Sequence, residues 1–302
     1  MKKSRRDFIK KSTLAIAGMS LASRAVLASA SDEILTGIQL YSIRRDMKTN
    51  PLDTLTKLAE MGYKHVEHAN YVDRKFYGWQ PSEFKNILND LGMKMPSGHT
   101  VLGKDHWSES NNDFTDQWKY TVEDAAYMGQ EFVISPWLDQ SLRQNKDDLK
   151  KYMEVFNKCG ELCSKSGMKF GYHNHDFEFS QKLDGTRIFN IILDNTDPNL
   201  VIQQLDIGNM INGGAHAKDI MDEFPGRFES MHVKDEIKST SGNEGFESTI
   251  LGDGIVDVKD IVDLGIKQGG TRHLIIEQES YQGKTPLECV KTDLERMKSW
   301  GY

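Results

Sequence analysis

Histidine and carboxylate side chains lie near the ends of four consecutive apolar runs in the second half of the sequence. The runs MKFGYHNH, VIQQLDIG, RFESMHVKD and HLIIEQE carry, in turn, His173, Asp206, His232 and Glu277. Residues alternate between the two faces of a strand, and these polar side chains share the face opposite the bulky apolar ones. Buried ionisable groups are costly unless they are paired or bind a cation. The sequence therefore predicts a site for one divalent ion, of Mn²⁺, Zn²⁺, Co²⁺ or Fe²⁺.

Some polar residues on the same predicted face are candidate proton carriers. His175 and Lys234 each follow a proposed ligand by two positions, and Glu67 lies in the earlier run KHVEHA. Histidine, lysine and glutamate all serve as general acids or bases when they are positioned beside a reacting group. We therefore predict that the catalytic residues come from these three and Glu277.

Other residues are candidate substrate contacts. Gln39 and His99 fall on the interior face of earlier runs, and Trp137 stands at the end of the fourth run, where an indole ring could contact a ligand. The same alternation assigns Ser135 to the interior. These residues belong to different runs, so a fold that gathers the run ends would bring them to one place.

Eight short β-like runs alternate with amphipathic helical stretches, which predicts a (β/α)8 TIM barrel. In that fold the interior faces of the strands alternate and the chemistry collects at their C-terminal ends. A doubly wound sheet is the alternative, but the turn SIRRDM after the first run lacks a glycine-rich phosphate loop. Glycine follows several helical stretches, as expected for a left-handed helix C-cap. The predicted strands are 36–43, 64–69, 93–99, 131–137, 168–175, 201–208, 227–235 and 273–279; the predicted helices are 51–61, 81–91, 113–129, 146–166, 186–194, 216–223, 257–268 and 286–299.

The first 30 residues have the pattern of an export signal rather than of the barrel. Arg5 and Arg6 precede DFIK, a modest apolar stretch follows, and Ala28-Ser29-Ala30 forms a cleavage site. The arginine pair resembles a twin-arginine signal. We therefore predict a signal peptide over 1–30, a barrel domain over 31–302, export by the twin-arginine machinery and a periplasmic location. The apolar stretch is too short for a stable membrane anchor.

The charge of the chain argues against nucleic acid as a partner. The full sequence carries a net charge of −7, and without residues 1–30 it has 31 basic and 44 acidic side chains, a net charge of −13. Such a surface repels phosphate backbones. The sequence therefore predicts no nucleic-acid partner.

Six segments of the chain resemble the sugar phosphate isomerase/epimerase family, within the xylose isomerase-like TIM barrels. The similarity extends from about residue 34 to residue 302 and is carried by GIQLYSIR, HVEHA, SGHT, LDIGN, MHVKD and LIIEQE. Members of that family bind one divalent metal through Glu, Asp, His and Glu from strands five to eight. The resemblance implies that Asp206, His232 and Glu277 are the last three of these ligands. It also implies that the partner is a small-molecule carbohydrate substrate.

The fifth strand departs from the family pattern. Many relatives read LENH where this chain reads YHNH, so His173 stands in place of the metal-binding glutamate. Glu178 is the reserve candidate for this ligand. Epimerases of the family use two metal-bound glutamates as opposed bases, and only Glu277 remains of that pair. The second proton carrier would then be His175, Glu67 or Lys234.

Three functions are compatible with these residues. The first is a metal-dependent sugar isomerase or epimerase that abstracts a proton next to a carbonyl of a sugar or keto-sugar. The second is a lyase, dehydratase or glycoside-cleaving enzyme acting on keto-sugars, since elimination begins with the same proton abstraction. The third is a periplasmic sugar-binding protein without catalysis.

Changing both arginines of the leader tests the export prediction. Arg5→Lys together with Arg6→Lys should retain the precursor in the cytoplasm, because the paired guanidinium groups are the recognised feature. Cell fractionation and immunoblotting measure the distribution. A matched control changes the second arginine pair of the chain, Arg44 and Arg45, to lysine. Undiminished periplasmic protein from the leader variant would contradict the prediction.

Overall fold

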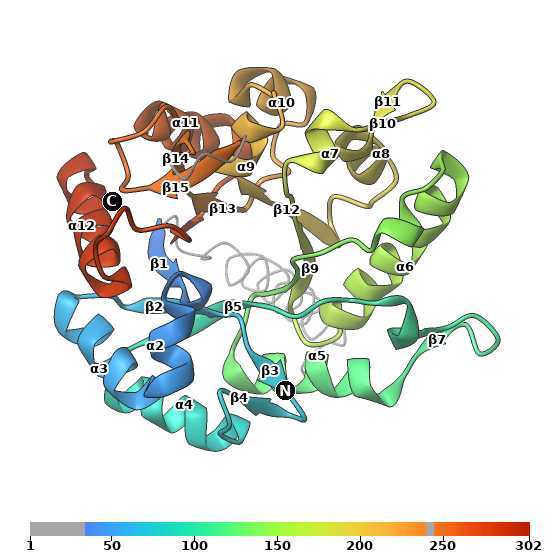
Figure 1. Ribbon diagram of the computed structural model, residues 1–302. Helices are drawn as coiled ribbons and strands as arrows, with labels where there is room; N and C mark the ends of the chain where they lie inside the picture. The colour runs from blue at the N-terminus through green and yellow to red at the C-terminus, as the bar shows by residue number, and fades with distance from the viewer. Residues whose placement is uncertain (1–33, 240–244) are drawn as a thin grey trace, which may run out of the picture. The chain divides into compact units, whose positions relative to one another are not determined.

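Eight parallel strands form a closed barrel, which confirms the predicted (β/α)8 fold. The computed structural model describes residues 34–239 and 245–302. Neighbouring strands pair in the order β1-β16-β13-β12-β9-β8-β5-β2, and helices surround them (Figure 1). The strands are β1 Leu35–Gln39, β2 His65–His68, β5 Lys94–His99, β8 Phe132–Ser135, β9 Lys169–His173, β12 Val201–Asp206, β13 Ser230–Val233 and β16 His273–Ile276. The predicted signal peptide lies outside the described residues. Within them, no helix combines the length and apolarity that a membrane span requires.

All eight predicted helices are present, but the short helices 44–49, 177–180 and 207–212 were not predicted from the sequence. Gly62 and Gly129 end α3 and α5 with φ values of 103° and 84°, the left-handed conformation expected of a glycine C-cap. The helices are α2 Arg44–Thr49, α3 Pro51–Met61, α4 Pro81–Asp90, α5 Asp116–Met128, α6 Lys146–Ser164, α7 Phe177–Ser180, α8 Ile188–Asp194, α9 Ile207–Asn212, α10 Ala217–Glu223, α11 Val258–Leu264 and α12 Pro286–Trp300. A π-helical turn, Gly265–Gly269, continues α11.

Four small hairpins extend the loops that follow the barrel strands. Each consists of two short antiparallel strands, and three of the four have strands of only two residues. They are β3 Tyr71–Val72 with β4 Lys75–Phe76, β6 Trp107–Ser108 with β7 Asp113–Phe114, β10 Lys182–Leu183 with β11 Thr186–Arg187, and β14 Asp235–Lys238 with β15 Phe246–Thr249. These hairpins add backbone around the end of the barrel where a TIM barrel places its chemistry.

The strands are generally shorter than predicted; the sixth, for example, ends at Asp206, where a helix begins at Ile207. Two further details also differ from the prediction. The first strand ends at Gln39, and the chain continues as a 3₁₀ helix, Leu40–Ile43, because the Gln39 side-chain oxygen accepts a hydrogen bond from the Tyr41 amide at 3.1 Å. The interior assignment of Ser135 is wrong. Its neighbour Ile134 contacts the interior residues instead, while the Ser135 hydroxyl accepts from the Leu102 amide at 3.0 Å.

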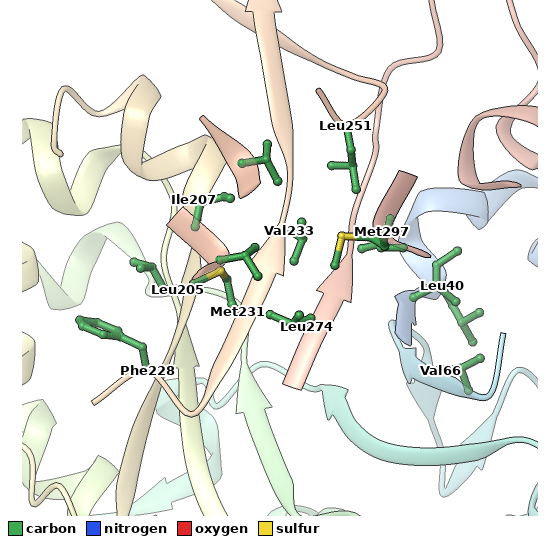
Figure 2. Packing of buried hydrophobic residues seen from close by; sticks show 14 of the residues in the cluster. Leu40, Val66, Leu205, Ile207, Phe228, Met231, Val233, Leu251, Leu274 and Met297 are labelled. Atoms are coloured by element: carbon green, nitrogen blue, oxygen red, sulfur yellow. The ribbon is translucent and has the colours of Figure 1, made fainter. Parts of the chain in front are cut away.

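Apolar packing occupies both sides of the barrel wall. On the outer side, Leu205, Met231 and Leu274 come from adjacent strands and lie beneath the surrounding helices (Figure 2). On the inner side, Phe132 and Ile134 of β8 and Ile202 of β12 form a small buried cluster. Burial of one such side chain contributes about 1.5–3 kcal/mol. The interior above this cluster, toward the C-terminal strand ends, is polar.

Two buried aspartates anchor the loop 250–256 beside the end of β13. The Asp235 carboxylate accepts hydrogen bonds from four backbone amides, those of Glu236, Gly252, Gly254 and Val256. Asp293 of α12 accepts from the Leu251 amide at 2.9 Å. Because Asp235 directly follows Lys234 in the chain, this anchoring fixes the backbone that carries the lysine.

Asp293 makes the stability of this anchoring depend on pH. Its Oδ2 has no hydrogen-bond partner in the described part of the chain, and burial raises the pKa of the carboxyl to about 7. The unfolded chain ionises this group at a lower pH than the folded protein does. The carboxyl group therefore destabilises the folded protein increasingly as the pH rises. The loss of stability begins near the pKa of the unfolded chain and is complete above the pKa of the folded protein.

Asp293→Asn should remove this penalty while keeping an oxygen for the Leu251 amide. The free energy of unfolding should rise by about 2–4 kcal/mol at about pH 8 and change little at about pH 4. The size of the gain follows from the pKa difference between the folded and unfolded states, since each pKa unit corresponds to about 1.4 kcal/mol. Denaturant titrations at both pH values measure the difference. Asp253→Asn, at an exposed position of the same loop, is the control and should show no such pH dependence. An equal gain at both pH values would refute this account.

Candidate metal centre and active site

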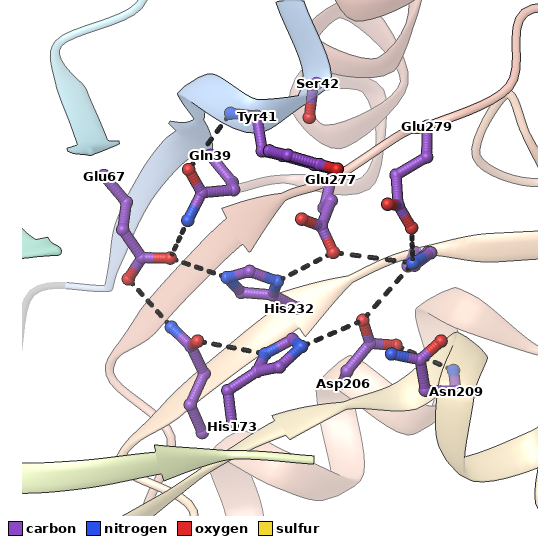
Figure 3. A network of polar contacts seen from close by, with 12 residues as sticks. Gln39, Tyr41, Ser42, Glu67, His173, Asp206, Asn209, His232, Glu277 and Glu279 are labelled. Carbon is purple, nitrogen blue, oxygen red and sulfur yellow. Dashed lines mark hydrogen bonds and ion pairs between the residues drawn. The ribbon is translucent and has the colours of Figure 1, made fainter. Parts of the chain in front are cut away.

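The four predicted metal ligands meet at the C-terminal ends of consecutive strands. His173 ends β9, Asp206 ends β12, His232 lies in β13 and Glu277 directly follows β16. One nitrogen or oxygen atom of each lies within 4.8 Å of those of the others, and all four side chains are buried. The strand register brings them together, since Asp206 pairs with His232 and Gln204 pairs with His173. Figure 3 shows their side chains converging from separate strands.

Asp206 shows most directly that the group fits a cation. Its Oδ1 accepts from the Asn209 amide at 2.7 Å, but its buried Oδ2 has no hydrogen-bond partner among the described residues. The nearest nitrogens to Oδ2 are Lys234 Nζ at 3.6 Å and His173 Nε2 at 3.9 Å. Burial raises the pKa of Asp206 to about 6, although Lys234 opposes the rise. A buried carboxylate oxygen without a donor is costly, and a metal ion would satisfy it.

His232 is held between two carboxylates. Its Nε2 lies 2.6 Å from Glu67 Oε1 and its Nδ1 lies 3.1 Å from Glu277 Oε2. Burial lowers the pKa of His232, but Glu277 and Glu67 together raise it to about 10. The metal-free imidazole therefore carries protons on both nitrogens. Metal binding through Nδ1 would release one of them and leave Nε2–H on Glu67, the carboxylate–histidine arrangement common behind metal ligands.

His173 is neutral and presents one nitrogen to the group. Burial and the neighbouring His232 and His99 hold its pKa well below the usual range. Nδ1 lies 3.2 Å from the side-chain oxygen of Gln204, so Nε2 is left facing Asp206. A neutral imidazole is the form that binds metals. With two imidazole nitrogens and two carboxylates, these residues fit the donor set of a transition-metal ion.

Lys234 lies beside the two carboxylates of the group. Its Nζ is 3.5 Å from Glu277 Oε2 and donates to Glu279. Burial lowers the pKa of this amine, but Asp206, Glu277 and Glu279 outweigh burial and raise it well above the usual value. Lys234 is therefore a protonated ammonium group. It can donate a proton or stabilise negative charge, but it cannot act as a base in this state.

A cavity of about 440 Å³ opens above the group. Among the predicted site residues, it is lined by His99, His173, His175, Lys234 and Glu277. Its wall also contains Tyr41, Tyr71, Asn209 and Glu279, to which the sequence assigned no role. A larger cavity of about 560 Å³ runs along α6, but no histidine lines it and none of the four-residue group belongs to it. The smaller cavity is therefore the candidate active site.

Several predicted site residues do not line this cavity: Gln39, Glu67, Trp137 and the proposed ligands Asp206 and His232. Gln39 and Glu67 are fully buried, and the Gln39 side-chain nitrogen donates to Glu67 at 2.8 Å. Glu67 also accepts from Ser97 and His232 and is fully occupied by donors. Gln39 and Glu67 therefore support the proposed ligand His232 through hydrogen bonds and are too deeply buried to contact a substrate. Trp137 packs its ring edge against His175, with ring centroids 5.1 Å apart, and contributes to the cavity through that histidine.

His175 and Glu178 have distinct places after β9. His175 lines the cavity, and its Nδ1 has no hydrogen-bond partner within the residues described. Burial and Lys234 lower the pKa of His175 to about 4, so the imidazole is neutral. The Glu178 carboxyl accepts from the Tyr172 hydroxyl and from the His175 amide at 2.8 Å. Glu178 therefore stabilises the turn that carries His175, and it does not belong to the four-residue group.

The comparisons with known proteins agree with this fold. The sequence model of the xylose isomerase-like TIM barrel family matches residues 55–300. The chain belongs to this family. Curated relatives include inosose dehydratases from Clostridium perfringens, 27% identical over 213 residues (65% of this chain and 61% of the relative), and Geobacillus kaustophilus, 22% identical over 253 residues (74% and 79%). The match to the Clostridium protein therefore spans less than two thirds of that relative.

Solved structures of the family give the same picture. A sugar phosphate isomerase/epimerase from Parabacteroides distasonis is 27% identical, with a TM-score of 0.77 over 90% of this chain and 96% of the other. The IolI protein, solved with a bound zinc atom, shares the fold at 14% identity and a TM-score of 0.68, over 88% of this chain and 98% of the other. The names of these relatives, inosose dehydratase and sugar phosphate isomerase/epimerase, are those of enzymes that act on sugars or related polyols.

Alanine substitutions test the metal site. Asp206→Ala, His232→Ala and Glu277→Ala should each weaken binding of a divalent ion by about 100-fold or more, since even residues behind the ligands typically contribute 10–100-fold. Titration of chelator-treated protein with Zn²⁺, Mn²⁺ or Co²⁺ measures this affinity. Glu279→Ala is the matched control, because Glu279 pairs with Lys234 but lies outside the four-residue group. A wild-type protein that takes up none of these ions would overturn the assignment.

Proposed function

We propose that this protein is a metal-dependent lyase that removes the proton next to a carbonyl of a keto-sugar and then eliminates a β-substituent. The observation that carries the proposal is a neutral imidazole and a protonated amine on the wall of one cavity, next to the four-residue group. His175 is the neutral group and Lys234 the protonated one. Elimination needs both, a base for the carbon-bound proton and an acid for the leaving oxygen.

The ligands in this proposal are His173, Asp206, His232 and Glu277. When bound, a divalent cation supplies a Lewis acid that stabilises negative charge on a substrate oxygen. His173 replaces the glutamate that serves as a second base in related epimerases. A metal-bound imidazole has its lone pair occupied, so His173 cannot take that part. The replacement favours chemistry that uses a single base on the substrate.

The chain's own residues can move the required protons. His175 accepts the proton from the carbon next to the carbonyl, and the electron pair of that C–H bond forms the enediolate. The enediolate then re-forms the carbonyl while the bond to the β-oxygen breaks. Lys234 donates its Nζ proton to the departing oxygen, which leaves as water or an alcohol. Both residues line the same cavity, so one bound sugar can contact both.

The charges around the cavity favour an uncharged substrate. Asp206, Glu277 and Glu279 carry three negative charges, and Lys234 is the one lysine or arginine that lines the cavity within the described residues. A divalent ion would balance these charges without leaving a surplus of positive charge. A phosphate or carboxylate group binds where positive charge is in excess. A free keto-sugar or keto-glycoside suits the cavity better, as it would suit a protein exported to the periplasm.

Isomerisation or epimerisation of a keto-sugar is the second candidate. It begins with the same proton abstraction, and the solved relative at 27% identity is named a sugar phosphate isomerase/epimerase. The curated relatives at 22–27% identity are named inosose dehydratase, which agrees better with a lyase. The two activities differ in their products. A lyase yields an unsaturated or rearranged sugar and a released water or alcohol, whereas an epimerase yields a stereoisomer.

The test follows proton exchange and product formation together. Metal-loaded protein incubated with keto-sugars and keto-glycosides in D₂O should exchange the proton next to the carbonyl and release the β-substituent, both visible by NMR. His175→Gln should keep the metal and slow both processes by about 10²–10⁴-fold, the usual contribution of a positioned base. His216→Gln, at an exposed histidine, is the control. Exchange with inversion and no release would replace the lyase with the epimerase, and no exchange at all would refute both.

A further inference from the structure

Gln204 lies at the centre of the buried polar layer beneath the proposed ligands. Its side chain is fully buried in β12, two residues before Asp206. The amide nitrogen donates to Glu67 Oε2 at 2.8 Å and to Ser230 Oγ at 3.0 Å. The amide oxygen lies 2.7 Å from His99 Nε2 and 3.2 Å from His173 Nδ1. One residue therefore contacts two histidines and the carboxylate that supports a third.

The direction of the Gln204 amide follows from the chemistry of Glu67. Glu67 Oε1 accepts from the Gln39 side-chain nitrogen at 2.8 Å, and Glu67 Oε2 accepts from the Ser97 hydroxyl at 2.5 Å. A carboxylate surrounded by donors only accepts hydrogen bonds. The group of Gln204 that faces it must be the NH₂ group. The carbonyl oxygen must then face the two histidines, as the structure places it.

This direction decides which nitrogen of His173 carries the proton. A carbonyl oxygen only accepts, so the Nδ1 of His173 must be the protonated nitrogen and Nε2 must hold the lone pair. Without Gln204 the opposite form would be favoured. A proton on Nε2 would face Asp206 Oδ2, 3.9 Å away, and would supply the donor that this oxygen lacks. That form cannot bind metal through Nε2.

We infer that Gln204 is a positioning residue that makes a histidine usable as the fifth-strand ligand. Its oxygen holds His173 in the Nδ1–H form, and its nitrogen holds Glu67 in place to support His232. A glutamate at position 173 would not need this help, because a carboxylate has no tautomers. The inference rests on the proposed metal site but not on the proposed reaction.

Gln204→Met tests the inference in the metal-free protein. Methionine matches glutamine in length but offers no amide, so His173 should move its proton from Nδ1 to Nε2. Long-range ¹H–¹⁵N correlation spectra of histidine-labelled protein distinguish the two forms, with the His173 signals assigned from His173→Ala. Titration with Co²⁺ should show affinity about 10–100-fold weaker than in the wild type, the range typical for residues behind metal ligands.

Gln203→Met is the matched control. Gln203 is also buried in β12, but it lies on the opposite face, and its side-chain nitrogen donates to Asn174 at 3.2 Å. This variant should keep His173 in the Nδ1–H form. The inference is overturned if His173 in the wild-type metal-free protein carries its proton on Nε2, a result that stands even if Gln204→Met does not fold. It is also overturned if Gln204→Met leaves the tautomer unchanged, or if both variants change it equally.

Discussion

The buried carboxylate of Glu67 is the interaction on which the site depends. It accepts hydrogen bonds from Gln39, Ser97, Gln204 and His232, which come from four different strands. A buried carboxylate is tolerated only when donors surround it. These hydrogen bonds hold the Glu67 carboxylate in place and also orient the four donor side chains. His232 is held by Nε2, and Gln204 is turned so that its oxygen faces His173. The ligand atoms converge above this layer because the layer leaves their side chains little freedom.

The barrel brings these residues together through closure rather than through sequence proximity. β1 and β2 contribute Gln39 and Glu67, and β12 and β13 contribute Gln204 and His232 from the opposite half of the chain. Apolar packing on the outside of the wall and the small cluster inside it hold the strands in register. The anchoring of the loop 250–256 by Asp235 fixes the backbone next to Lys234. The packing and hydrogen bonds that stabilise the barrel therefore also set the geometry of the site.

The buried charges of the site are the physical basis for the proposed cation and for the proposed uncharged substrate. Asp206 and Glu277 are buried side by side, with Lys234 as their nearest ammonium group. An ion at the four-residue group would balance them and free Lys234 to act on a substrate. His175 stands on the same cavity wall as a neutral base. In the proposed site, the histidine at position 173 stands where the resemblance to the epimerases would place a glutamate.

The sequence by itself determined the eight βα units, the helix ends and the interior face that carries His173, Asp206, His232 and Glu277, because strand alternation and helix periodicity are local properties. Tertiary structure decided the rest. It ended the first strand at Gln39, turned Ile134 rather than Ser135 inward, and kept Trp137 off the cavity wall. It also placed Gln39 and Glu67 beneath the ligands and gave Gln204 its role, which strand alternation could mark only as an inward polar residue. These outcomes depend on contacts between residues far apart in the chain, and such contacts exist only once the barrel has closed.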